Sequence, residues 1–186
     1  MQAKSLNPGN QLTAIENRAH MHLAPIVKSM EWADESATRR FACALAARPA
    51  LCDSFIELHG ELGAGKTTLV RHLLQALGVQ GRIKSPTYAV VEPYELVAAP
   101  GAAGPRMVWH FDFYRFHDPR EWEDAGFRDI FASVGLKLAE WPEKAAASLP
   151  RADLAIHIDA RLDGVRQVRL VANTPVGAAL LEAAHP

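Results

Sequence analysis

The sequence predicts a three-layer α/β domain in which helices cover both faces of a mixed β-sheet. Three observations predict this fold. An apolar strand, a glycine-rich loop and an amphipathic helix follow one another across residues 55–77. Two further apolar runs, 107–112 and 136–140, each end in a carboxylate, which is where open α/β sheets place their ligands. Residues 154–170 alternate around an Asp-Gly turn, which predicts an antiparallel hairpin and therefore a mixed sheet.

The composition fits one globular domain. Of 186 residues, 49% are hydrophobic and 22% are charged. We interpret residues 29–186 as this domain and the aperiodic residues 1–28 as a flexible tail. The net charge of -1 gives no global basic field for nucleic acid or an anionic membrane. No apolar run is long enough to span a bilayer, and two cysteines without C-x-x-C spacing suit a reduced, cytoplasmic protein.

The glycine-rich loop has the phosphate-binding P-loop pattern G-x-x-x-x-G-K-T at residues 60–67. A short apolar strand precedes it at 55–58. The residues after it have helical apolar spacing, and Gly78 follows where a helix would stop. The alternative is an ordinary glycine turn before a helix, but the strand and helix on either side favour the P-loop.

This loop predicts a polyphosphate site and a P-loop NTPase-like fold. Glycines let successive N–H groups point into one concavity, and the helix that begins near Lys66 adds its positive N-terminal dipole. The Lys66 ammonium is expected to reach the β- and γ-phosphates, and the Thr67 hydroxyl is expected to hold Mg²⁺. Thr68 is expected nearer the α-phosphate.

A helix is predicted from Asp34, its N-cap, to Arg48, because Pro49 follows. Glu35 in its first turn is a candidate contact for a nucleotide base or ribose. The favoured interpretation of Glu35 on propensity alone is a solvated first-turn residue.

The segment Ser85-Pro86-Thr87 follows the P-loop helix. Pro86 favours an extended conformation at Ser85, so Thr87 is expected on an exposed loop. In P-loop nucleotidases a switch threonine at this place meets Mg²⁺ and the γ-phosphate. The alternative, an ordinary turn, stays open.

Two carboxylates end predicted strands. The run 107–112 resembles a Walker B strand, whose Asp112 would hold the Mg²⁺ shell, although His110 interrupts it. Glu140 ends the run 136–140 and could hold Mg²⁺-bound water or orient the attacking water. The alternatives are a capping Asp112 and a rim carboxylate at Glu140. Trp141 follows Glu140, either as a lid or partner-facing aromatic or in simple packing.

The other predicted elements are less informative about function. They are a strand at 88–96 with Pro93 as an edge signal, a surface loop at 97–106, short helices at 119–125 and 127–131, and a short helix at 176–184. The eight histidines have no metal-ligand spacing and are interpreted as structural or solvated.

Several blocks together resemble one family, the bacterial TsaE proteins. They are the P-loop, K-S-P-T-Y at 84–88, V-E-P-Y at 91–94, H-F-D-F-Y-R at 110–115, D-P at 118–119, G-F-R-D at 126–129 and E-W-P at 140–142. The P-loop is widespread, whereas S-P-T-Y, H-x-D-x-Y-R and E-W-P in this order are much more specific. The resemblance covers residues 34–159. The long N-terminal stretch, the Ala/Gly/Pro-rich loop and His59 depart from the pattern but touch no motif position.

The resemblance implies a small domain that binds ATP and Mg²⁺ and hydrolyses ATP. It also implies work with TsaD and TsaB, the complex that modifies an adenosine of tRNA with a threonylcarbamoyl group, so that tRNA is met only indirectly. The ATPase would support turnover of that complex.

Residue by residue, the resemblance gives three sets. The nucleotide-binding set is Glu35, Gly60, Gly63, Ala64, Gly65, Lys66, Thr67, Thr68 and Trp141. The catalytic set is Lys66, Thr87, Asp112 and Glu140. The metal-binding set is Thr67, Asp112 and Glu140.

Two other functions stay open from the residues. A P-loop small-molecule kinase would need an arginine-bearing lid, and no arginine cluster is visible. A nucleotide-binding interaction module would have only vestigial hydrolysis. Arg115 and Arg128 are candidates for an arginine finger, although a surface role is favoured for both. Without a finger the isolated ATPase would be slow and would need a partner.

Overall fold

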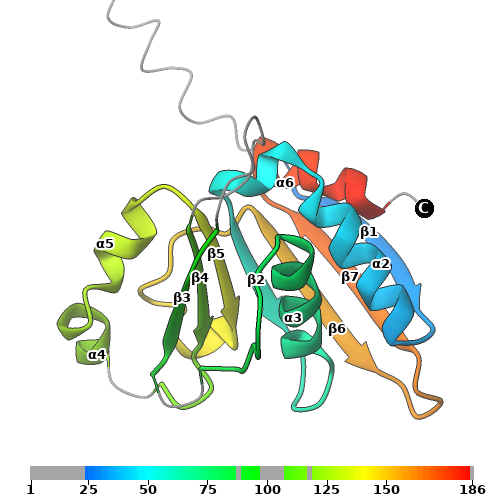
Figure 1. Cartoon of the computed structure of the whole chain (residues 1–186), viewed down its shortest axis with the longest axis horizontal. Coiled ribbons are helices and arrows are strands. Elements are labelled where there is room, and N and C mark those ends of the chain that lie inside the picture. Colours follow the sequence, from blue (N-terminus) through cyan, green and yellow to red (C-terminus); the bar gives the residue numbers. More distant parts are fainter. Residues whose placement is uncertain (1–23, 87–88, 97–106, 117–118, 185–186) are drawn as a thin grey trace, which may run out of the picture.

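A computed structural model describes residues 24–86, 89–96, 107–116 and 119–184. Within them the chain forms one seven-stranded sheet in the order β1-β7-β6-β2-β5-β4-β3, flanked by helices (Figure 1). The strands are β1 (Ile26–Trp32), β2 (Phe55–His59), β3 (Val91–Glu95), β4 (Met107–Asp112), β5 (Leu136–Glu140), β6 (Leu154–Ala160) and β7 (Arg166–Ala172). The α-helices are α2 (Glu35–Ala46), α3 (Lys66–Ala76), α4 (Pro119–Asp124), α5 (Phe127–Ala132) and α6 (Pro175–Leu180). The 3-10 turns are η2 (Pro49–Asp53), η3 (Pro142–Lys144) and η4 (Leu181–Ala184).

The sheet is mixed, as predicted. Strands β4, β5, β2 and β6 run parallel, whereas β1, β3 and β7 pair antiparallel with their neighbours. The predicted C-terminal hairpin is β6–β7. Because the parallel strands share one direction, the ends of β2, β4 and β5 meet at one edge of the sheet. That edge carries the P-loop, Asp112 and Glu140.

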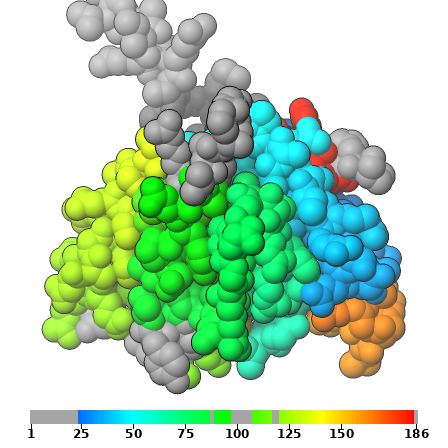
Figure 2. All heavy atoms as spheres, viewed as in Figure 1, coloured from blue at the N-terminus to red at the C-terminus, as the bar shows by residue number. Residues whose placement is uncertain are grey.

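Two cores lie on the two faces of the sheet, which confirms the three-layer prediction. On one face α2 and α3 lie side by side (Figures 1 and 2). The core on this face contains aliphatic side chains such as Ile56 and Leu58. On the other face an aromatic cluster joins Phe111 of β4 and Phe113, just after that strand, to Trp122 of α4 and Phe127 of α5. Alternate residues of β4 thus belong to different layers, and His110 and Asp112 project toward the layer of α3.

The edge strand β1 is not among the elements predicted from the sequence, and Ile26 to Lys28 fall inside the range assigned to the tail. It pairs with β7 from Ile26↔Ala172 to Trp32↔Arg166. Most of β1 is exposed, so its pattern lacks the clear alternation that reveals a half-buried strand. Its pairing with β7 decides its conformation.

The predicted helix at 34–48 is α2. The Asp34 carboxylate caps it by accepting a hydrogen bond from Ala37 N at 2.8 Å. The helix ends at Ala46, earlier than predicted, because η2 begins at Pro49. The described residues contain no helix of the length and apolarity that a membrane crossing requires.

Candidate active site

The P-loop connects β2 to α3, and its glycines adopt a backbone that other residues avoid. Gly60, Gly63 and Gly65 have φ of 142°, 82° and 114°. A Cβ on Gly60 would lie 2.3 Å from the carbonyl oxygen of Ile158, so only glycine fits there. Gly65 caps α3, and its successor Lys66 is the first helical residue.

The Lys66 side chain folds back over the loop. Its Nζ donates to the carbonyl oxygens of Gly60 at 2.5 Å and Glu61 at 3.0 Å. The same ammonium lies 3.9 Å from the ring centroid of Trp141, a cation–π contact. Burial lowers the pKa of Lys66, and the nearby Glu140 carboxylate opposes that shift. The site thus holds a largely buried ammonium bonded to two backbone carbonyls and an indole face.

Glu140 ends β5, the strand directly beside β2, and its two oxygens are held separately. Thr67 Oγ1 donates to Glu140 Oε2 at 2.8 Å. His110 Nε2 lies 2.8 Å from Glu140 Oε1. The carboxylate that meets the P-loop hydroxyl is therefore Glu140, because β5 stands between β4 and the P-loop strand.

Asp112 ends β4, one strand further from the P-loop, and opposes Glu140 in the register. Its Oδ2 accepts a hydrogen bond from Ser85 Oγ, and its Oδ1 accepts one from Tyr114 N at 3.0 Å. Asp112 thereby ties the segment after the P-loop helix to the sheet. Thr87 of that segment lies outside the described residues.

A cavity of about 410 Å³ joins these groups. Its lining includes Gly63, Gly65, Lys66, Thr67, Thr68, Ser85, Asp112, Arg115, Glu140 and Trp141. Trp141 has φ of 57° and packs against Tyr114 with a centroid distance of 5.0 Å. This combination of hydroxyls, carboxylates and cations in one hollow suits a polyphosphate with a hard cation.

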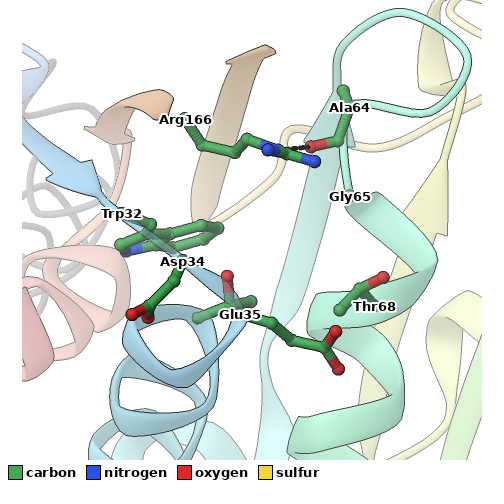
Figure 3. A pocket seen from close by; sticks show the side chains of 8 residues that line it. Trp32, Asp34, Glu35, Ala64, Gly65, Thr68 and Arg166 are labelled. Atoms are coloured by element: carbon green, nitrogen blue, oxygen red, sulfur yellow. Dashed lines mark hydrogen bonds between the residues drawn. The ribbon is translucent and has the colours of Figure 1, made fainter. Parts of the chain in front are cut away.

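A smaller cavity of about 90 Å³ opens on the other side of Gly65 (Figure 3). The Glu35 side chain extends from the start of α2 toward Thr68 on α3, and Glu35 Oε1 lies 3.0 Å from His72 Nε2. From β7, Arg166 Nε donates to the carbonyl oxygen of Ala64 at 3.2 Å, which braces the loop. This hollow is lined by residues of the P-loop, of α3 and of the start of α2.

The structure gathers the sequence-predicted site residues that it describes around these two cavities. Sequence reasoning missed Arg166 and the contacts of His110. Arg166 lies about a hundred residues from the P-loop in the chain, and no local pattern marks it. His110 is visible in the sequence as a polar residue inside an apolar strand, but a histidine without metal-ligand spacing is interpreted as structural or solvated.

The fold and the site together define a P-loop NTPase-type α/β protein, with the phosphate loop between β2 and α3 and carboxylates on the adjoining strand ends.

The chain belongs to the TsaE family. The family described as "Threonylcarbamoyl adenosine biosynthesis protein TsaE" matches residues 32–168. This finding confirms the resemblance recognised in the sequence, and it places the chain in a family with a role in the biosynthesis of threonylcarbamoyladenosine in tRNA.

Individual relatives agree. The chain is 44% identical over 128 residues to the tRNA threonylcarbamoyladenosine biosynthesis protein TsaE of Haemophilus influenzae, covering 69% of this chain and 76% of that protein. It is 32% identical over 117 residues to the protein of the same description from Bacillus subtilis, covering 63% and 68%. The crystal structure of Bacillus subtilis YdiB superposes with a TM-score of 0.61 at 25% identity and covers 84% of this chain and 94% of that chain.

Proposed function

We propose that this protein is a Mg²⁺-dependent ATPase that acts with TsaD and TsaB and supports turnover of that tRNA-modifying complex. One observation carries the proposal: Thr67 of the P-loop donates to Glu140 at 2.8 Å, next to the desolvated ammonium of Lys66. A hydroxyl, a carboxylate and a lysine in this arrangement serve phosphoryl transfer in P-loop enzymes.

The phosphates of ATP would lie along residues 63–68, where loop amides and the N-terminus of α3 favour anions. Lys66 would leave the carbonyls of Gly60 and Glu61 for the β- and γ-phosphate oxygens. The ribose or base would enter the smaller cavity, where Glu35 is the proposed polar contact. Trp141 would remain against the phosphate region.

The oxygen donors at the cavity fit Mg²⁺, which binds through one or two carboxylates together with phosphates and water. Thr67 and Glu140 would hold it, with Asp112 in the shell around it. The cation would neutralise charge on the β- and γ-phosphate oxygens.

In the proposed reaction a water oxygen forms a bond to the γ-phosphorus while the bond from this phosphorus to the β–γ bridging oxygen breaks. Lys66 and the loop amides neutralise charge that grows on the phosphoryl oxygens. Glu140 orients the water, and Asp112, through Ser85, holds the segment that leads to Thr87.

The proposed partner face is the mouth of the large cavity. Leu62 and Tyr114 line it while remaining 78% and 42% exposed. Exposed apolar groups at a polar cavity suit a protein surface that completes the site. Contact with tRNA would be indirect, through TsaD and TsaB. We also propose a cytoplasmic location, which is compatible with Cys43 and Cys52 being free thiols.

The test is phosphate release from Mg²⁺ and ATP by the purified chain, alone and with TsaB and TsaD. We expect slow release alone, a strong rise with both partners, and loss of both in Lys66→Ala. The matched control is Lys144→Ala, because Lys144 is an exposed lysine of η3 that lines neither cavity.

Three results would contradict the proposal. Phosphate release at the same rate with and without the partners would contradict the proposed action with TsaD and TsaB and would support only a P-loop nucleotidase. Phosphorylated product from an added small acceptor would favour the kinase. Nucleotide binding that Lys66→Ala abolishes, with no release in any mixture, would favour the interaction module.

A further inference from the structure

His110 is a polar side chain in an apolar layer. It lies in β4 with 0% of its surface exposed, on the side of the sheet that packs against α3. Its register neighbour on β5 is Leu138, and the preceding residue on the same side of β4 is Val108, both fully buried. The imidazole reaches diagonally past Leu138 to Glu140, with His110 Nε2 2.8 Å from Glu140 Oε1.

Packing alone does not account for an imidazole here. His110 Nδ1 is buried and has no hydrogen-bond partner within the part of the chain that the structure describes. An unsatisfied buried polar atom costs about 1–3 kcal/mol. An apolar side chain of similar size would avoid that cost, so the contact at Nε2 is what sets His110 apart from the apolar residues around it.

The Nε2 atom holds one of the two oxygens of Glu140. An ionised carboxylate oxygen only accepts hydrogen bonds, so Nε2 is the donor, and the ring is fixed in one tautomer when neutral. The other oxygen accepts from Thr67, whose hydroxyl also faces the phosphate cavity. Asp112, on the same strand, is bound to Ser85 and to Tyr114 N. Among the described residues, His110 is therefore the side chain that holds Glu140 without lining the cavity, whereas Thr67 lines it.

We propose that His110 is a positioning residue, which orients the Glu140 carboxylate for ATP hydrolysis. The proposal rests on the proposed ATPase function. Thr67 lines the cavity in which a nucleotide and Mg²⁺ would also bind its hydroxyl, whereas His110 is fully buried. Because Glu140 is 2% exposed and His110 holds the oxygen that Thr67 does not, the imidazole would fix how the carboxylate meets the ligand.

The decisive test compares His110→Gln with His110→Asn. Both replace the imidazole with an amide of similar polarity. The glutamine nitrogen reaches the position of Nε2, whereas the asparagine nitrogen reaches only that of Nδ1. We expect His110→Gln to keep most of the kcat for phosphate release. We expect His110→Asn to lower kcat by about 10–100-fold, as outer-sphere variants do, while the KM for ATP changes little.

A double-mutant cycle with Glu140→Gln separates positioning from a structural effect. If His110 acts through Glu140, His110→Asn lowers kcat in the wild-type background and has no further effect in Glu140→Gln. Equal kcat in His110→Gln and His110→Asn, or an additive loss in the double variant, would overturn the proposal.

A second readout needs no turnover. In the nucleotide-free protein we expect the Nε2 proton of His110 to be protected from exchange in NMR spectra and to shift in Glu140→Gln. An unchanged signal in that variant would overturn the proposed contact. Failure of the ATPase itself would show as absent phosphate release in the wild type with TsaB and TsaD, which leaves this NMR result to decide the contact separately.

Discussion

Two buried lysines lie at opposite ends of the parallel strands, and each has 4% of its surface exposed. Lys66 stands at the carboxyl ends of the parallel strands, and Lys137 stands near the start of β5. Burial lowers the pKa of both ammonium groups, and each lies over an indole: Lys66 at 3.9 Å from the Trp141 centroid and Lys137 at 5.3 Å from that of Trp109.

Their surroundings differ in what they leave open. Lys137 Nζ donates to the carbonyl oxygen of Ser133 and lies 3.7 Å from Asp53 Oδ1. Both partners belong to the protein and lie near the amino end of β5. Lys66 faces a cavity of about 410 Å³ that also contains Glu140 and Asp112. A buried lysine with a lowered pKa is therefore not by itself a sign of function. The cavity and the converging carboxylates distinguish Lys66, the lysine that we propose is functional, from Lys137.

The largest expected effect is a difference in the rate of phosphate release between variants of the two lysines. Lys66→Ala should lower phosphate release by about 10²–10³-fold, because a cation at the developing phosphoryl charge is lost. Lys137→Met should leave release per folded molecule unchanged. Phosphate release with TsaB and TsaD present, normalised to folded protein by circular dichroism, measures both. A similar loss of phosphate release in both variants would contradict the different roles proposed for Lys66 and Lys137.

A smaller effect is expected from the carboxylates that accompany the lysines. Glu140→Gln should lower kcat by about 10–100-fold, because the amide no longer orients water or a cation as a carboxylate does.

The matched variant at the other end of the strands is Asp53→Asn. The new asparagine would keep an oxygen to accept from Gly135 N but would lose the charge that lies 3.7 Å from Lys137 Nζ, so Asp53→Asn should lower the free energy of unfolding by up to about 1 kcal/mol with kcat intact. Urea unfolding monitored by tryptophan fluorescence, together with the phosphate assay, distinguishes the two carboxylates. A loss of stability without a loss of kcat in Glu140→Gln would show that Glu140 is structural and would contradict its proposed role in hydrolysis.

The smallest effect is a change in how stability depends on pH. Because the folded-state pKa of each lysine is below 10.5, the folded state releases these protons at a lower pH than the unfolded state does. The unfolded state then binds more protons, so the free energy of unfolding rises as the pH increases through the folded pKa toward 10.5.

Removing either lysine should remove its share of that rise. Urea titrations of the wild type, Lys66→Met and Lys137→Met from pH 7 to about pH 10 would measure the slope of unfolding free energy against pH. Equal slopes in all three proteins would show that neither ammonium is desolvated in the folded state.

Most of the fold and the centre of the site follow from local patterns. The P-loop, α3 and the strand ends at Asp112 and Glu140 were predicted, because glycine conformation, apolar periodicity and carboxylates at strand ends are written in adjacent residues. The edge strand β1 was not predicted, because its conformation depends on pairing with β7, which lies more than a hundred residues away.

The partners within the site could not be predicted in the same way. Sequence patterns offered Asp112 as the Walker B carboxylate and Glu140 as a second strand-end carboxylate that could hold Mg²⁺-bound water or orient the attacking water. The strand order, with β5 between β4 and β2, brings Glu140 against Thr67 and leaves Asp112 with Ser85.

By itself the sequence determined the type of loop and the family, and it predicted which residues would bind phosphate, since each of these depends on residue types at short spacing. Only the tertiary structure decided which carboxylate meets the loop hydroxyl, that His110 holds its second oxygen and that Arg166 braces the loop from β7. The physical reason is that these contacts join strands distant in sequence, and strand order and register set distances that no local pattern encodes.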